Sequence, residues 1–208
     1  MAFRVADAGQ AHRQAIERGA WDLPTRAAAM ELIIPGIRGA GDSHIYFVDR
    51  HGDFSIYDVD FTPIAGAEPA PPAVADLHYF GVVQTAGPGR TAAWLEFYRS
   101  LFGFTVLPSG QFFGVVNKGV LLESPGRKFL LQLIEPLEGE DDAWEESLLR
   151  IGLGAPDVLA AVRALQARGI VFVDRGEIRP TERGAVTQLY PGGVSFELVR
   201  SHPGTASR

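Results

Sequence analysis

Residues 155–170 read APDVLAAVRALQARGI, and their pattern returns near the start of the chain as VADAGQAHRQAIERGA at residues 5–20. In both segments an aspartate precedes a run of helix-forming residues and a glycine follows it, and the two align without a gap. Aspartate is a favoured N-terminal helix cap, and glycine is a favoured C-terminal stop. We therefore expect the same unit of strand, helix and turn to occur at both places.

A third unit of this kind lies between the two. It begins with LHYFGVVQ at residues 77–84 and continues with RTAAWLEFYRSLFGF at residues 90–104. Apolar residues at the spacing i, i+3, i+4 and i+7 predict a helix with one broad apolar face. The residues of this face are Trp94, Phe97, Tyr98 and Leu101. We interpret the aromatic rings as core packing, and Gly103 as the stop of the helix.

Short runs of strand-forming residues follow this helix. They lie at residues 112–116, 120–123 and 128–135, and turn-forming glycine and proline residues separate them. The pattern predicts a β-meander after the helix. Together with the strand before the helix, it gives a module of one strand, one helix and three strands.

The last strand of the module recurs as well. Residues 194–201, VSFELVRS, resemble residues 43–50, SHIYFVDR, and Tyr46 then falls at the position of Glu197. The chain therefore holds three βαβββ modules, which predicts the α+β class. Such repeated units need a partner to bury their apolar faces.

Composition divides the chain into parts. Residues 62–76 are rich in proline and alanine, which is typical of a semi-rigid linker. We expect a single module at 1–61, a pair of modules at 77–201 and a short tail at 202–208. The acidic stretch 135–146 connects the paired modules, and we interpret it as a solvated loop.

Charge and composition exclude several functions. The net charge of -6 argues against nucleic-acid binding, which needs basic residues to neutralise phosphates. Because the chain has no cysteine, disulfides, thiolate metal sites and cysteine nucleophiles are excluded. We find neither a signal-peptide pattern at the start nor a run long enough to span a membrane. These features predict a cytoplasmic protein without a membrane partner.

The order of the segments resembles the vicinal oxygen chelate superfamily. Within it, the chain is similar to 4-hydroxyphenylpyruvate dioxygenase and to the C-terminal half of two-domain bacterial 3-dehydroshikimate dehydratases. The segments that carry the resemblance read FRVADA, IPGIRGAGDSHIYFVDR, SIYDVDF, LHYFGVV, WLEFYRSLFGF, LLESPGRKFLLQLIEP and VTQLYPGGVSFELVR. The resemblance implies modules paired into a barrel, with one extra N-terminal module, since a complete dioxygenase has four modules in two domains.

The resemblance also implies an Fe(II)-dependent dioxygenase, an oxidoreductase whose non-haem iron is held by two histidines and a glutamate. His78, in LHYFGVV, matches the first histidine, and Glu197, in SFELV, matches the carboxylate. The position of the second histidine holds Arg150. A guanidinium stays protonated in proteins and has no lone pair for a metal, so this corner of the iron site is lost.

The family resemblance also assigns residues to the ligand. Ser124 and Gln188 match positions that hold the 2-oxo acid or its ring, whereas Ile134 stands where an asparagine is usual. In the dioxygenases an aromatic helix follows the glutamate strand and closes the site. Here only SHPGTASR follows Arg200, so we expect no such lid.

Two hypotheses about function remain open. The first is an active Fe(II)-dependent dioxygenase on an aromatic 2-oxo acid, with water or a histidine from another chain as the substitute ligand. The second, which we favour, is a metal-free protein that binds a small molecule such as an aromatic or 2-oxo carboxylate. In it Arg150 forms a charge-assisted pair with Glu197 and can bind the ligand carboxylate.

The odd number of modules predicts an assembly. The unpaired module at 1–61 would expose one β face where a partner belongs. We expect it to pair with the same module of a second chain across a twofold axis, which makes a homodimer. The alternative is that it folds back on the second domain of its own chain.

Overall fold

The chain forms two compact units, Met1–Pro71 and Pro72–Arg208. No helix in the described part of the chain is both long and apolar enough to cross a membrane. The computed structural model describes residues 1–25, 32–52, 55–68, 71–109, 114–115, 119–136, 145–176 and 178–201.

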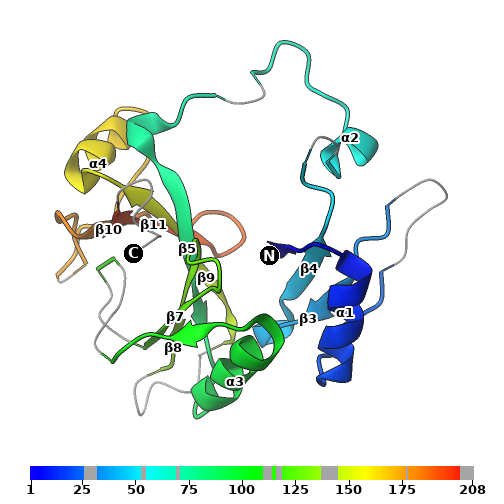
Figure 1. Cartoon of the computed structure of the whole chain (residues 1–208). Helices are drawn as coiled ribbons and strands as arrows, with labels where there is room; N and C mark the ends of the chain where they lie inside the picture. The colour runs from blue at the N-terminus through cyan, green and yellow to red at the C-terminus, as the bar shows by residue number, and fades with distance from the viewer. Residues whose placement is uncertain are drawn as a thin grey trace. The chain divides into compact units, whose positions relative to one another are not determined.

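The first unit is one module built on a four-stranded sheet of order β1-β4-β3-β2 (Figure 1). β1 runs parallel to β4, and the other two pairings are antiparallel. The strand, helix and three strands therefore follow the predicted order. Their bounds are β1 Ala2–Arg4, α1 Ala8–Glu17, β2 Asp22–Leu23, β3 Gly36–Arg38 and β4 His44–Val48, with short helices η1 Ala40–Asp42 and α2 Tyr57–Asp60.

The second unit is built on a seven-stranded mixed sheet of order β10-β11-β9-β5-β8-β7-β6. It is an open sheet that holds two modules, each with one long helix. The elements are η2 Val74–Asp76, β5 His78–Thr85, α3 Thr91–Phe102, β6 Thr105–Val106, β7 Val120–Glu123, β8 Leu130–Ile134, β9 Ser147–Ala155, α4 Val158–Gln166, β10 Gly184–Val186 and β11 Ser195–Arg200.

The two modules of this sheet meet at their first strands. β5 and β9 pair antiparallel at the centre of the sheet. On its other side each first strand runs parallel to the last strand of its own module, β5 to β8 and β9 to β11. The predicted α+β class is confirmed. The predicted run 120–123 is β7, the run 128–135 contains β8, and most of the run 112–116 lies outside the described residues.

The helices begin and end where the sequence predicts. The side chains of Asp7 and Asp157 each accept a hydrogen bond from a backbone N–H in the first turn of α1 and α4. Gly19 and Gly169, which follow these helices, have φ angles of 90° and 86°. Glycine adopts this left-handed conformation without the steric cost that a Cβ brings. The repeat therefore sets the same helix boundaries twice.

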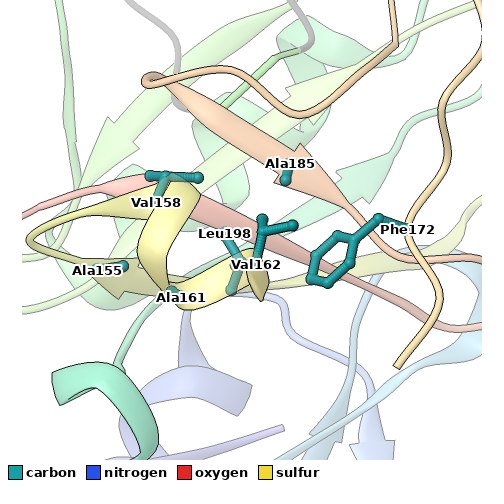
Figure 2. Close-up of a cluster of buried hydrophobic side chains, with 7 residues drawn as sticks. All are labelled: Ala155, Val158, Ala161, Val162, Phe172, Ala185 and Leu198. Atoms are coloured by element: carbon teal, nitrogen blue, oxygen red, sulfur yellow. The ribbon is translucent and has the colours of Figure 1, made fainter. Parts of the chain in front are cut away.

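One face of the second sheet packs against α4. Figure 2 shows the side chains of α4 gathered with those of the neighbouring strands and of Phe172 in this cluster. All of its members are at most 8% exposed, so the cluster is a closed apolar layer. Its residues are Ala155, Val158, Ala161, Val162, Phe172, Ala185 and Leu198.

Helix α3 packs through the predicted aromatic face. Tyr98 is fully buried, and its hydroxyl donates to Oε1 of Gln84 in β5 at 2.5 Å. Trp94, Phe97 and Leu101 are half-buried beside it. The burial of Tyr98 confirms the interpretation of this face as core packing. Gln84 supplies the hydrogen-bond partner that a buried tyrosine hydroxyl needs.

The acidic connection between the modules is held at both ends. The backbone N–H of Thr91 donates to Oε1 of Glu135 at 2.6 Å. The indole N–H of Trp94 donates to Oε1 of Glu146 at 2.8 Å. Both carboxylates therefore fasten the connection to the first turns of α3. Both side chains are half-buried, and the middle of the stretch, where the solvated loop is predicted, lies outside the described residues.

Candidate functional site

The polar site residues lie on the face of the second sheet that α4 does not cover. In the parallel register of β9 and β11, Arg150 pairs with Ser195 and Gly152 pairs with Glu197. Paired residues on neighbouring strands point to the same face, and residues two apart on a strand share a face. Arg150 and Glu197 therefore point to one face. Leu198, the next residue of β11, belongs to the layer under α4 on the other face.

Arg150 and Glu197 form a buried ion pair. Nη1 of Arg150 lies 3.6 Å from Oε2 of Glu197, and the two side chains are 13% and 0% exposed. This separation is longer than a hydrogen bond, so the attraction is electrostatic. Nη1 finds no hydrogen-bond acceptor in the described part of the chain. Burial lowers the pKa of Arg150, and the neighbouring carboxylate opposes this shift by favouring the charged guanidinium.

The second oxygen of Glu197 is held by the backbone. The N–H of Val115 donates to Oε1 of Glu197 at 2.7 Å. The preceding residue, Gly114, has a φ of 74°, and a Cβ at this position would overlap the Glu197 carboxylate. Only glycine lets the backbone approach the carboxylate so closely in this conformation. Protein groups therefore contact both oxygens of Glu197.

His78 lies at the start of β5, on the same face, and contacts the end of β11. Its Nδ1 is 3.3 Å from the carbonyl oxygen of Asp76, and its Nε2 is 3.3 Å from Oγ of Ser201. A carbonyl oxygen only accepts, so we infer that Nδ1 carries the proton and Nε2 accepts from the Ser201 hydroxyl. The ring lies over Gly154, where a Cβ would collide with Nε2.

Sequence comparison finds relatives of known name. The 4-hydroxyphenylpyruvate dioxygenase of Pseudomonas sp. (strain P.J. 874) is 34% identical over 125 residues, which are 58% of this chain and 35% of that protein. Hemolysin VllY of Vibrio vulnificus (strain CMCP6) is 31% identical over 186 residues, 83% of this chain and 52% of that protein. The 4-hydroxyphenylpyruvate dioxygenase of Pseudomonas aeruginosa is 30% identical over 184 residues, 83% of this chain and 51% of that protein. The chain thus spans about half or less of the length of each relative.

A family model and solved structures agree with these relatives. The model for the N-terminal part of hydroxyphenylpyruvate dioxygenase matches residues 1–62. A xylose isomerase-like TIM barrel/4-hydroxyphenylpyruvate dioxygenase fusion protein has a TM-score of 0.70 at 17% identity, over 99% of this chain and 39% of that one. A mutant of 4-hydroxymandelate synthase from Streptomyces coelicolor has a TM-score of 0.68 at 18% identity, over 99% of this chain and 72% of that one. The chain is similar to members of the vicinal oxygen chelate superfamily. The resemblance to 4-hydroxyphenylpyruvate dioxygenase stated from the sequence is confirmed.

The iron centre that this similarity suggests does not fit the residues present. Arg150 offers no lone pair, and its positive charge beside Glu197 would repel a cation. The lone pair of His78 Nε2 points to Ser201, and Glu197 is engaged by Arg150 and Val115. Within the described ranges, no three histidine, aspartate or glutamate side chains are grouped to hold a metal ion. The side chains of His78 and Glu197 are therefore bound to other groups of this chain and are not arranged to hold Fe(II).

The two remaining residues that are predicted to contact a ligand, Ser124 and Gln188, are held by backbone hydrogen bonds. Ser124 follows β7 and is half-buried, and its backbone closes the turn to β8 through hydrogen bonds with Phe129 and Arg127. Gln188 follows β10 and is exposed, and its N–H donates to the carbonyl oxygen of Val171 at 3.1 Å. Their role in ligand binding stays a prediction.

The sequence did not predict which groups contact His78 and Glu197. Nothing in the local sequence indicates that the backbone of Val115 meets Glu197, or that Ser201 meets His78. One signal was present, because IGLG at residues 151–154 alternates glycines along a strand. Glycines spaced by two within a strand mark a face that another group approaches closely.

Proposed function

We propose that the second unit is a 4-hydroxyphenylpyruvate dioxygenase-like domain that binds a small carboxylate without a metal. The observation that carries the proposal is the buried pair of Arg150 and Glu197, at the place where the family resemblance expects a histidine beside the glutamate. The guanidinium supplies the positive charge next to the carboxylate. The domain then keeps the electrostatic pattern of an iron centre without its redox chemistry.

Arg150 retains the capacity to bind a second anion. A guanidinium carries five N–H donors, and Nη1 makes no hydrogen bond to any described residue. Nη1 is itself buried and the whole side chain is 13% exposed, so a carboxylate that reaches the guanidinium would be largely withdrawn from water. A carboxylate can accept two parallel N–H bonds from a guanidinium, which is the strongest form of this contact. The Glu197 carboxylate would meanwhile hold the guanidinium in place.

The names of two relatives suggest a probe. Both are called 4-hydroxyphenylpyruvate dioxygenase, and the compound in that name is an aromatic 2-oxo carboxylate. From these names we take only the class of ligand, an aromatic carboxylate, and we do not propose that this chain oxidises it. The proposal therefore concerns binding, in the cytoplasmic location that the sequence predicts.

The test is a calorimetric titration of the full chain with 4-hydroxyphenylpyruvate in EDTA. The wild-type chain should bind. Arg150→Met should weaken binding about 10- to 150-fold, because a hydrogen bond to a charged group contributes about 1.5–3 kcal/mol. Arg150→Lys should give an intermediate affinity, since it keeps the charge but loses the planar fork. Arg99→Met, at a side chain that is 60% exposed on α3, is the matched control and should bind as the wild type.

Three outcomes would overturn the proposal. One is a wild-type chain that does not bind this probe in EDTA. Another is equal binding by Arg150→Met, with circular dichroism showing that the variant is folded. The third is binding that requires added Fe(II), which would favour an active dioxygenase with a substitute ligand.

A further inference from the structure

In every module the first strand lies beside the last strand of that module. β1, β5 and β9 each run parallel to the last strand of their own module, β4, β8 and β11. On the other side, β5 and β9 pair with each other. β1 stands at the end of its sheet, and no described strand pairs with its outer side. One module interface is therefore complete and the corresponding edge of the first unit is open.

The backbone of β1 is arranged for pairing on this outer side. The carbonyl oxygen of Met1 accepts from the N–H of Tyr46 at 3.0 Å, and the N–H of Val5 donates to the carbonyl oxygen of Val48 at 2.9 Å. Backbone groups alternate in direction along a strand, so the N–H and C=O of Ala2 and Arg4 point outward. Such unpaired groups at a sheet edge are a template for another strand.

The internal repeat shows which residue of β1 would lie at the centre of such a pairing. In the second unit, β5 and β9 pair at Gly81 and Gly152, near the middle of both strands. In the alignment of the two helical segments, Ala2 corresponds to Gly152. The same correspondence holds in the sheets, because Ala2 pairs with Tyr46 as Gly152 pairs with Glu197. Both residues are small, which permits close approach at an axis.

We propose that β1 pairs antiparallel with β1 of a second copy of this chain, about a twofold axis at Ala2. An isologous interface needs a surface that is complementary to itself. An antiparallel pair of identical strand edges meets this need, because Ala2 of each copy exchanges N–H and C=O with its mate. The result is an eight-stranded sheet across two copies, the counterpart of the sheet that β5 and β9 join. This inference does not depend on the proposed ligand.

Because the chain has no cysteine, single-cysteine variants of the full chain test the register. In a hydrogen-bonded antiparallel pair, opposite Cα atoms lie about 5.5 Å apart, within the range that a disulfide spans. Ala2→Cys should therefore form a disulfide-linked dimer under mild oxidation. Arg4→Cys, on the same edge and face, is the matched control. Two such cysteines would lie four residues out of register, about 14 Å apart, and should stay unlinked.

A second measurement separates assembly from cross-linking. Analytical ultracentrifugation should give a dimer for the wild-type chain at micromolar concentration. Ala2→Pro should reduce the dimer fraction severalfold, because it removes an outward N–H and none of those directed to β4. Ala2→Val, which keeps the N–H, should remain dimeric. A wild-type monomer throughout the concentration range, a dimer indifferent to Ala2→Pro, or equal linking of the two cysteine variants would overturn the proposal.

Discussion

The replacement of Arg150 by methionine tests the buried ion pair quantitatively. At 3.6 Å and an effective dielectric constant of about 20, the attraction between Arg150 and Glu197 is about 5 kcal/mol. The removal of one partner of a buried pair typically costs about 3–5 kcal/mol, since the other charge stays in a medium of low dielectric constant. Because the contact is longer than a hydrogen bond, we expect the lower end of this range, about 3 kcal/mol.

The assay is urea unfolding followed by tryptophan fluorescence. Trp21 belongs to the first unit and is 74% exposed, so a Trp21→Phe background leaves the signal to the other two tryptophans without disturbing a core. The double variant Arg150→Met/Glu197→Gln should be more stable than Arg150→Met alone, by at least about 1 kcal/mol, because it removes the uncompensated charge. The reasoning would be refuted by a loss below about 1 kcal/mol in the single variant, or by a double variant that is no more stable.

Two further substitutions test the contact of Gly114 with Glu197 and the contact of Glu135 with the start of α3. Gly114→Ala should lower the free energy of unfolding by more than about 2 kcal/mol, because the added Cβ would collide with Glu197 at a position of positive φ. The control is Gly126→Ala, whose Cβ would have no atom within 4 Å, and its free energy of unfolding should stay near that of the wild type in the same urea titration. The pKa of Glu135 is held below its ordinary value, first by a hydrogen bond from the side chain of Thr91, so its stabilising effect is present above the unfolded pKa and is lost as pH falls through the folded pKa. The stability difference between wild type and Glu135→Gln should therefore shrink between pH 7 and about pH 3, and a constant difference would contradict this.

The sequence predicted the modules because their signals are local. A cap such as Asp157 and a stop such as Gly169 act within one turn of the helix, so their spacing defines α4 without knowledge of its neighbours. The apolar face of α3 is likewise encoded by its own period. These features need no information from distant segments.

The site was predictable only in part, because its contacts join distant segments. The family resemblance gave Arg150 and Glu197 as neighbours, and the structure places their side chains 3.6 Å apart. The backbone N–H of Val115 leaves no trace in a residue pattern, since every residue except proline has one. Ser201 lies 123 residues from His78, and only the register of the central strands brings their side chains together.

The most direct test of the account is the iron content of the chain purified without chelators, measured by plasma mass spectrometry before and after anaerobic loading with Fe(II). With Arg150 in place of a ligand, we expect far less than one iron per chain in both samples. Arg150→His should gain iron on loading if His78 and Glu197 are still placed to hold it. Stoichiometric iron in the wild-type chain, lost in His78→Ala or Glu197→Ala, would contradict the central claim that a guanidinium has replaced the metal.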